Sequence, residues 1–312
     1  MAEMIATRVA YGEGLKLLAE QNKNVVVLDA DLSKSTKTAT FKSVCPERFF
    51  NVGIAEQDLV GVAAGLAACG KIPFASSFAM FAAGRAYEII RNSVAYPRLN
   101  VKIAATHAGL TVGEDGASHQ MLEDLSLMRT IPGMVVINPA DATEAKAAVV
   151  AAAEYEGPVY MRFGRMNVPV LFDEDYKFEI GKGVVIEEGT DVTFVATGIM
   201  VAMALEARET LAKEGISARV VNIHTIKPLD NELILESAEK TGAIVTAEEH
   251  SIYGGLGSAV SEVVVSGKVV PMEIVGVKDT FGESGTPADL LEKYGLTAAN
   301  LVESAKKAIS RK

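Results

Sequence analysis

The sequence has no tryptophan and only two cysteines, Cys45 and Cys69, among its 312 residues. The spacing of the cysteines fits neither a metal site nor a disulfide framework, so we expect neither. No apolar run reaches the roughly 18 uninterrupted residues that a membrane span needs. The N-terminus also lacks the basic and apolar regions of a secretory leader. These absences predict a protein of the cytoplasm.

Positive charge is scarce as well. The chain has 30 Lys and Arg against 40 Asp and Glu, which gives a net charge of −10. This balance argues against a nucleic-acid surface, and an anionic ligand would have to be bound by local cations. Hydrophobic residues make up 49% and charged residues 22%, as in ordinary globular proteins. A chain of 312 residues is long enough for two domains, each with its own core.

Short apolar runs alternate with segments of helical periodicity along the whole chain. The run Val25–Leu28 is short and continuous, which is typical of a strand buried on both faces of a parallel sheet. This alternation predicts an α/β protein of two consecutive three-layer α/β/α domains with mainly parallel sheets. Asp141 and Thr297 are placed to cap the helices that follow them. Further strands are expected at 72–75, 101–106, 134–137, 159–162, 192–196, 219–223, 243–247 and 272–277, and helices at 5–20, 79–95, 142–153 and 298–309.

The pattern breaks between residues 166 and 188, where Val168-Pro169, an acidic cluster and two glycines follow one another. We interpret this stretch as a connection between domains. The expected division is a first domain at 1–167, a linker at 168–188 and a second domain at 189–312. No repeat of a fixed short period relates the halves, so they look like different α/β domains.

A single carboxylate, Glu56, stands at the start of an expected helix. From residue 59 to residue 80 the only charged residue is Lys71. Glu56 is therefore either a solvated acid that stabilises the helix dipole or an acid aimed at a basic group in a dry pocket. Phe78 and Phe81 are three residues apart, so on a helix they would share a face.

A Gly-rich stretch without periodicity runs from residue 107 to residue 120. Long irregular loops in compact domains are usually functional. It contains His107 and His119, two of the four histidines of the chain, which favours a functional role for the loop. The other two, His224 and His250, we interpret as structural or interfacial.

Several segments, taken together, resemble the pyrimidine-binding domain of transketolases, and the second half of the chain resembles the C-terminal domain of that family. The combination is specific, although no single segment is. The resemblance covers essentially the whole chain but only the C-terminal half of a usual transketolase. The segments are Glu56, Ser77–Phe81, Thr106-His107, Gly113–Gln120, and Pro139-Ala140-Asp141 through to Arg165.

One motif of the wider family is missing. Enzymes that use thiamine diphosphate hold Mg2+ and the diphosphate with a Gly-Asp-Gly segment and a downstream Asn, and no Gly-Asp-Gly occurs here. A hard cation needs oxygen ligands in fixed geometry, and the sequence offers no candidate set. The resemblance therefore implies that the metal, Mg2+ or Ca2+, is held mainly by an N-terminal transketolase subunit on another polypeptide.

The resemblance also implies an assembly. In the family the active site lies between the pyrimidine domain of one protomer and the diphosphate domain of another. Self-association into an α2β2 heterotetramer, with two copies of each subunit, is then the smallest closed arrangement. The small residues Gly61, Ala64, Gly65 and Ala68 would let a partner helix approach the helix that begins at Glu56.

The family's functional residues can be carried over to positions of this chain. The resemblance implies that Glu56 bonds the pyrimidine N1′ of thiamine diphosphate, which lets the cofactor's own amino group remove the proton from its reactive carbon. It places Phe78 and Phe81 beside the pyrimidine. A third aromatic of the family is Gly84 here, so either Arg85 fills that space or the pocket is more open.

The resemblance also implies the substrate contacts. It places the phosphate-binding residues at Arg8, Ser35, His107 and Arg165, and arginine suits a phosphate because its fork bonds two oxygens. The residues that contact the donor hydroxyls fall on Asp115 and His119, which are four apart in the Gly-rich loop.

The leading interpretation is the C-terminal subunit of a transketolase that transfers a two-carbon ketol unit from a ketose phosphate to an aldose phosphate, as in the pentose phosphate pathway. Two enzyme alternatives are a subunit related to 1-deoxyxylulose-5-phosphate synthase and the beta subunit of a 2-oxo-acid dehydrogenase. Neither would need the full phosphate-binding set. A non-catalytic regulatory paralogue is a third alternative, but such a protein could lose Glu56 freely.

Overall fold

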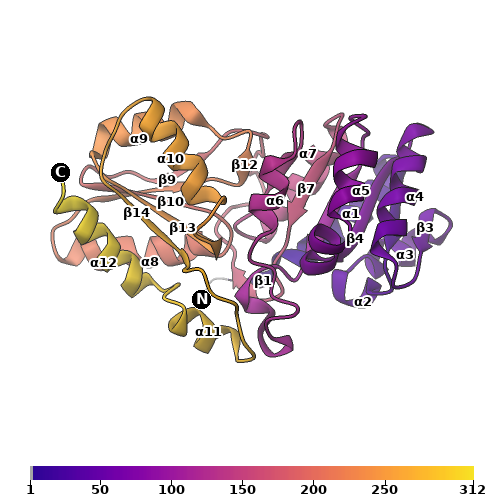
Figure 1. The fold of residues 1–312 in the computed structure, drawn as a ribbon, viewed down its shortest axis with the longest axis horizontal. Helices are drawn as coiled ribbons and strands as arrows, with labels where there is room; N and C mark the ends of the chain where they lie inside the picture. The colour runs from indigo at the N-terminus through magenta and orange to yellow at the C-terminus, as the bar shows by residue number, and fades with distance from the viewer. Residues whose placement is uncertain (1–2) are drawn as a thin grey trace.

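The computed structural model describes residues 3–312 and contains two large β-sheets, each covered by helices (Figure 1). The first sheet has the strand order β12-β6-β7-β5-β4-β2-β3, and neighbouring strands are parallel except for β12 with β6. Its strands are β2 (Val25–Asp29), β3 (Phe49–Asn51), β4 (Ile72–Phe78), β5 (Lys102–Thr106), β6 (Val135–Ile137), β7 (Val159–Arg162) and β12 (Thr225–Lys227).

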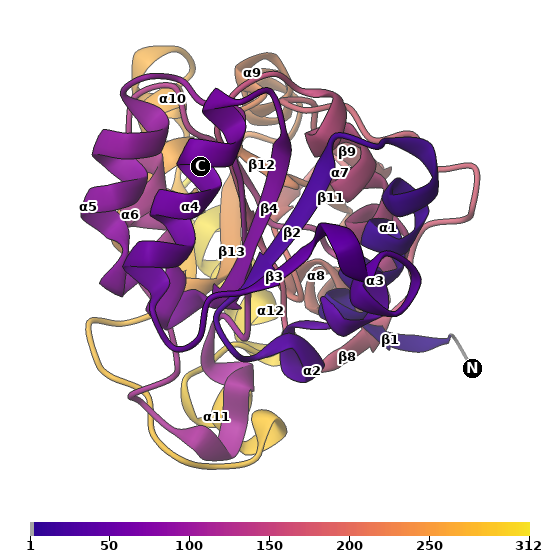
Figure 2. The same cartoon turned by 90° about the vertical axis from the view of Figure 1, so that its right-hand side faces the viewer.

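Both faces of the first sheet are buried, because alternate residues of its strands pack into two different apolar clusters. Val25 and Val27 of β2 belong to one cluster, and Val26 and Leu28 belong to the other. Figure 2 shows the two helical layers on opposite sides of the strands. One layer has α1 (Thr7–Gln21), α3 (Ala39–Val44) and α7 (Ala142–Glu154), and the other has α4 (Glu56–Ala68), η2 (Met80–Arg85), α5 (Tyr87–Ile89), η3 (Ile90–Ala95) and α6 (Asp124–Thr130).

The second sheet has the order β14-β13-β10-β11-β9, and only its edge strand β9 joins antiparallel within the described chain. In Figure 1, α9 and α10 cover one face, and α8 and α12 cover the other. The strands are β9 (Val184–Glu187), β10 (Val192–Ala196), β11 (Ala218–Asn222), β13 (Ile244–Ser251) and β14 (Met272–Val277). The helices are α8 (Met200–Lys213), α9 (Asn231–Thr241), α10 (Leu256–Ser266) and α12 (Ala298–Ile309).

Two strand pairings join segments that are far apart in the sequence. β12 comes from the second half of the chain but pairs with β6 at the edge of the first sheet. β1 (Met4–Ala6) pairs antiparallel with β8 (Asn167–Pro169) in a small sheet of their own. Thus β8 and β9 lie within or beside the stretch interpreted as a linker, while the domain limits at 167 and 189 stay predictions. The remaining short elements are α2 (Ser33–Thr36), η1 (Pro46–Arg48), η4 (Leu110–Asp115) and α11 (Pro287–Lys293).

The α/β architecture with mainly parallel sheets is confirmed, and so are several exact element bounds, such as β7, β10, β14 and α12. Asp141 and Thr297 accept hydrogen bonds from the backbone at the starts of α7 and α12, as expected for caps. The segment expected as a helix at 79–95 is helical, but it is not one regular α-helix. That segment is divided into π-helical η2 and η3 around α5, and Phe78 is the last residue of β4. None of the helices within residues 3–312 is long and apolar enough to cross a membrane.

Candidate active site

Glu56 is the first residue of α4, and its side chain is only 1% exposed. The helix is held against the sheet by buried apolar residues one turn further on, including Leu59 and Val60. The Glu56 Oε2 atom lies 2.7 Å from Nη1 of Arg85, the last residue of π-helical η2. Of the two interpretations left open by the sequence, the structure therefore favours the buried acid that faces a basic group.

Arg85 covers one side of this acid. Its guanidinium carbon lies 4.9 Å from the ring centroid of Phe81, and its side chain is 51% exposed. The neighbouring Gly84 is exposed, and a Cβ placed there would meet only the sulfur of Met80, at 3.8 Å. Arg85 thus occupies part of the space beside Phe81, and the rest of it is open.

Two aromatic rings lie next to each other at the end of strand β4. The centroids of Phe78 and Phe81 are 6.1 Å apart, with an angle of 16° between the ring planes. In the register of the sheet, Phe78 stands opposite Thr106 of β5, so the next residue, His107, comes beside the Phe78 ring. The His107 and Phe78 centroids are 3.8 Å apart. The rings are therefore brought together by the carboxyl ends of two parallel strands, where α/β proteins bind ligands, and not by a shared helix face.

Three cationic or polar residues, Arg8, Ser35 and Arg165, lie near His107. Arg8 Nη1 donates to the backbone oxygen of Ser35 at 2.8 Å and lies 3.3 Å from His107 Nε2. The backbone nitrogen of Gly164 donates to Thr7 Oγ1 at 2.8 Å, which brings Arg165 beside the first turn of α1. The structure therefore brings together Arg8, Ser35, His107 and Arg165, the positions that the resemblance implied, and their role toward a phosphate stays a prediction.

The electrostatics of this cluster favour an anion. Burial, followed by the charges of Arg8 and Arg165, lowers the pKa of His107 to about 3. Burial and the charge of Arg165 also lower the pKa of Arg8. Cations held this close repel one another, and an anion placed among them would stabilise all of them.

Lys37 belongs to the same group, because its charge also lowers the His107 pKa, and the sequence analysis missed it. The signal was the acid that precedes it at the end of β2. Buried Asp29 accepts hydrogen bonds from the hydroxyls of Thr36 and Thr38, at 2.7 and 2.9 Å, and so shapes the turn that carries Lys37.

The remaining candidates lie on the Gly-rich loop. His119 is half-buried, and its ring meets the edge of Phe81 at a centroid distance of 5.3 Å. Arg165 Nη1 donates to the backbone oxygen of Val112 and pairs with Glu114 at 3.0 Å. Asp115 is exposed, and no hydrogen bond or ion pair joins it to His119 within residues 3–312. The structure therefore places His119, but not Asp115, against the aromatic pair.

Comparison with known proteins decides the family. Residues 3–170 match the family described as "Transketolase, pyrimidine binding domain", and residues 181–301 match "Transketolase, C-terminal domain". The chain belongs to the transketolase family. Within that family it corresponds to the C-terminal section, as the resemblance implied.

Relatives of similar length show the same division of the family. A Methanocaldococcus jannaschii protein named as a transketolase C-terminal section is 54% identical, over 95% of this chain and 94% of its own length. The 6-deoxy-6-sulfo-D-fructose transketolase subunit SqwH of a Clostridium species is 46% identical, over 98% and 95%. A solved split-gene transketolase, an inactive β4 tetramer, is 62% identical over 99% of both chains, with a TM-score of 0.93.

Longer members of the family are also similar. They include 1-deoxy-D-xylulose-5-phosphate synthases, such as that of Desulforudis audaxviator, which is 39% identical over 95% of this chain. The chain spans 47% of that protein's length. This transketolase section therefore corresponds to about half of such enzymes.

The family implies thiamine diphosphate, and the residues at the site fit the pyrimidine end of that cofactor. A buried carboxylate can bond a ring nitrogen, and the Phe78 and Phe81 rings offer apolar faces for a flat ring. The space beside Gly84 is open on the same side. Among residues 3–312, no group of three or more His, Cys, Asp and Glu side chains is arranged to hold a metal ion.

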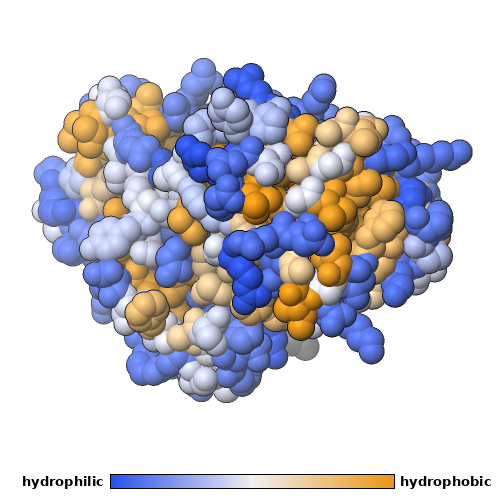
Figure 3. Space-filling model, turned by 45° about the vertical axis from the view of Figure 1, so that its right-hand side comes forward, coloured by the Kyte–Doolittle hydropathy of each residue, from blue (hydrophilic) through white to orange (hydrophobic). Residues whose placement is uncertain are grey.

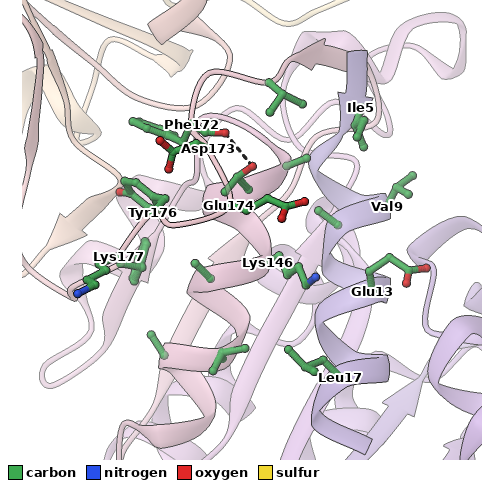
Figure 4. A pocket seen from close by; sticks show the side chains of 18 of the residues that line it. Ile5, Val9, Glu13, Leu17, Lys146, Phe172, Asp173, Glu174, Tyr176 and Lys177 are labelled. Atoms are coloured by element: carbon green, nitrogen blue, oxygen red, sulfur yellow. Dashed lines mark hydrogen bonds between the residues drawn. The ribbon is translucent and has the colours of Figure 1, made fainter. Parts of the chain in front are cut away.

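A large hollow elsewhere in the molecule is distinct from this site. Figure 4 shows it between α1 and α7, with Ile5, Val9 and Leu17 on one wall and Phe172 and Tyr176 on another. Its volume is about 1010 Å3, and none of the nine candidate residues lines it. Figure 3 shows apolar side chains at the surface on the right of the view and also at the upper left, so exposed apolar side chains do not by themselves mark the candidate site.

Proposed function

We propose that the chain is the pyrimidine-side subunit of a split transketolase, which transfers a two-carbon ketol unit from a ketose phosphate to an aldose phosphate. The observation that carries this proposal is the continuity of the site. The buried carboxylate of Glu56 pairs with Arg85, and the Arg85 guanidinium lies over the Phe81 ring. Phe81 neighbours Phe78, which stacks on His107 at 3.8 Å, where the cation cluster begins. A continuous series of side-chain contacts thus joins the proposed cofactor acid to the proposed anion site.

Glu56 is the proposed catalytic residue. When bound, thiamine diphosphate supplies the nucleophilic carbon to which the two-carbon unit is attached. Glu56 would hold a hydrogen bond to the pyrimidine N1′, and that bond would be strong because α4 and the sheet exclude water from the carboxyl group. Arg85 now occupies Oε2 of that carboxylate, so the cofactor has to use the other oxygen or displace Arg85.

The cation cluster is the proposed site for the anionic end of the sugar. Arg8 and Arg165 supply forked donors, His107 supplies a neutral ring, and the loop of Ser35 closes the group. His119 and Asp115 are the proposed contacts to the donor hydroxyls. A relative acts on a sulfonated sugar, and the same cations could bind a sulfonate. Phosphorylated and sulfonated donors should therefore be compared directly.

The diphosphate and its Mg2+ are proposed to lie on an N-terminal partner subunit. The outer face of α4 suits a close-packed partner, because Gly61, Gly65 and Ala68 are exposed there. Nearby Ile54 is 77% exposed, although it is a large apolar residue. The related split-gene chain forms a tetramer with itself; for this chain we propose an α2β2 assembly in the cytoplasm, with one active site at each contact between unlike subunits.

The direct test is reconstitution. The purified chain, with thiamine diphosphate and Mg2+, should transfer no ketol unit, and it should gain that activity when the N-terminal subunit is added. Transfer by the lone chain, with one cofactor bound per subunit, would contradict the proposal. So would an inactive mixture of two subunits that are shown to associate.

The similarity to 1-deoxy-D-xylulose-5-phosphate synthases supports a second candidate reaction. The reconstituted enzyme should be assayed for formation of 1-deoxyxylulose 5-phosphate alongside ketol transfer. Product in the first assay alone would favour the synthase, and product in the second alone would favour the transketolase.

A further inference from the structure

The Gly-rich loop of the candidate site lies between the two halves of the molecule. We call residues 108–120 the site loop; it contains η4 and ends just after His119. Figure 2 shows α11 beneath it, at the end of a long connection from β14. A Cβ on Gly113 would lie 3.3 Å from Pro287, and a Cβ on Gly116 would lie 2.5 Å from Ser284 Oγ. The second half of the chain therefore packs directly against the tip of the site loop.

The base of the site loop is bound by an acid from the second sheet. Glu249 of β13 is 4% exposed, and its Oε1 accepts a hydrogen bond from the Thr111 backbone nitrogen at 2.6 Å. Gly109, with φ +83°, passes so close that a Cβ there would lie 2.3 Å from the Glu249 carboxyl carbon. The carboxyl group thus fills the space that a side chain at position 109 would need.

The far end of the site loop is bound by an amide. Gln120 is 3% exposed, and its Nε2 lies 3.1 and 3.3 Å from the backbone oxygens of Leu110 and Gly113. The same nitrogen lies 2.9 Å from the backbone oxygen of Glu283, on the connection that leads to α11. One side chain therefore closes the loop on itself and ties it to the second half of the chain.

A buried ion pair supports both ends. Arg162 of β7 donates from Nε to Asp124 at 2.9 Å and from Nη2 to the backbone oxygen of Glu249 at 2.9 Å. It also reaches the backbone oxygen of Met121 at 3.3 Å, directly after the site loop. A buried charge needs all of its partners, so this arginine fixes the position of β13 relative to the loop.

The site loop in turn holds a residue of the cation cluster. Val112, the residue after Thr111, offers its backbone oxygen to Arg165 Nη1. The chain of contacts therefore runs from Glu249 through the loop backbone to Arg165. At the other end, Gln120 follows His119 directly.

We propose that Glu249 and Gln120 are positioning residues, through which the second domain holds the site loop so that Arg165 and His119 face the substrate. This inference rests on the proposed function, and it assigns the second domain a role in orienting the substrate. Neither residue is among the proposed contacts to the cofactor or the sugar. Both act through backbone atoms of the loop.

Three variants test the proposal. Glu249→Ala removes the acceptor, whereas Glu249→Gln keeps an oxygen at the same place. Burial raises the pKa of Glu249 to about 7, with the charge of Arg162 acting in the opposite sense, so a neutral amide is a close substitute. Glu262→Ala is the matched control, because Glu262 also pairs across the two halves, with Arg129 at 2.6 Å, but is 66% exposed and away from the loop.

Hydrogen exchange of the lone chain, followed by mass spectrometry, measures how firmly the site loop is held and does not require an active enzyme. Glu249→Ala should speed exchange of peptides from residues 108–120 by about tenfold or more, since it removes the buried acceptor of the Thr111 amide hydrogen bond. Peptides from β10 and α8 should be unchanged, and Glu249→Gln and Glu262→Ala should behave as wild type. Unchanged exchange in a folded Glu249→Ala chain would overturn the proposal.

With the partner subunit present, Glu249→Ala should raise the KM for a phosphorylated donor by about tenfold and change kcat less, because it misplaces Arg165. Glu249→Gln should restore the wild-type KM. If Glu249→Ala does not fold, Gln120→Met tests the other end with the same two measurements. A fall in kcat of about tenfold with an unchanged KM would overturn the proposal. Inactivity of the wild-type pair of subunits would instead count against the proposed function, and the hydrogen-exchange result would still hold.

Discussion

The guanidinium of Arg85 lies 2.7 Å from the Glu56 carboxylate and covers the Phe81 ring at 4.9 Å. The proposed catalytic acid therefore already has a strong partner. That partner is half exposed, while the acid is buried. Arg85 can swing outward into water, but Glu56 cannot, so binding of a pyrimidine beside Phe81 should move the arginine.

Replacing Arg85 should therefore help the cofactor. We expect Arg85→Ala to tighten binding of thiamine diphosphate to the assembled enzyme by about threefold to tenfold, because the cofactor no longer competes with a partly exposed ion pair. Arg91→Ala is the control, since Arg91 is exposed on the next turns and contacts Asn92 instead. Weaker cofactor binding in Arg85→Ala than in Arg91→Ala would mean that Arg85 helps to hold the cofactor.

Glu56→Gln should fold like the wild type and turn over slowly. The amide keeps the shape of the side chain but cannot share a proton with N1′ in the same way. We expect kcat of the reconstituted enzyme to fall by about 100-fold or more, with circular dichroism and thermal unfolding checked alongside. Activity close to wild type would show that Glu56 is not the activating acid.

Arg165→Ala should discriminate between donors. Removing a forked, charge-assisted contact should raise the KM for a phosphorylated donor by about 10- to 100-fold, equivalent to about 1.5–3 kcal/mol. The KM for an unphosphorylated ketose serves as the internal control and should change little. An equal rise for both donors would place Arg165 away from the phosphate.

The pKa of His107 should make the stability of the chain depend on pH. The folded-state pKa of about 3 lies below the ordinary value of 6.5, so the unfolded chain binds the extra proton between those values. The contribution of His107 to stability is thus present above about pH 6.5 and is lost as the pH falls toward 3, at up to about 1.4 kcal/mol per pH unit.

Inorganic phosphate among Arg8, Arg165 and Lys37 should raise the His107 pKa by about 1 or more, because it offsets their charges. Two-dimensional NMR of the imidazole carbons, titrated with and without phosphate, measures this directly. His224 is the internal control; burial lowers its pKa to about 3 as well, but it lies away from the cluster. A His107 pKa that is the same with and without phosphate would argue against an anion site.

The glycines of α4 allow assembly to be separated from folding. A Cβ on Gly65 would meet nothing within 4 Å in this chain, so Gly65→Ala should stabilise the lone chain by about 0.5–1 kcal/mol in thermal or denaturant unfolding. Gly65→Gln should also fold but should fail to bind the N-terminal subunit in size-exclusion chromatography. Ala212→Gln, at an exposed position of α8, is the control. Normal assembly of Gly65→Gln would move the proposed interface off α4.

Local patterns were enough for much of the secondary structure. The bounds of β7, β14 and α12 follow from short apolar runs and helical periodicity, and Asp141 and Thr297 act as the caps their positions suggested. These features depend on neighbours within a few residues, which the sequence displays directly.

The residues of the candidate site could be predicted only in part from the sequence. The resemblance to transketolases led to Arg8, Ser35, His107 and Arg165, and the structure brings them together. Lys37 was missed because a turn built by Asp29 carries it into the cluster. The strand expected at 72–75 continues to Phe78, because parallel pairing with β5 extends β4 to that residue, so Phe78 and Phe81 do not share the face of a helix.

The sequence by itself determined the alternation of strands and helices, the position of a lone acid at the start of a helix, and the family, but it left open whether that acid is solvated or buried. Only the tertiary structure decided that Arg85 pairs with that acid, that β12 completes the first sheet, and that Glu249 binds the site loop at Thr111, 138 residues earlier. The physical reason is the separation along the sequence of the residues that interact. Periodicity and capping are set by contacts between near neighbours, whereas these three contacts exist only after both sheets have closed their cores around them.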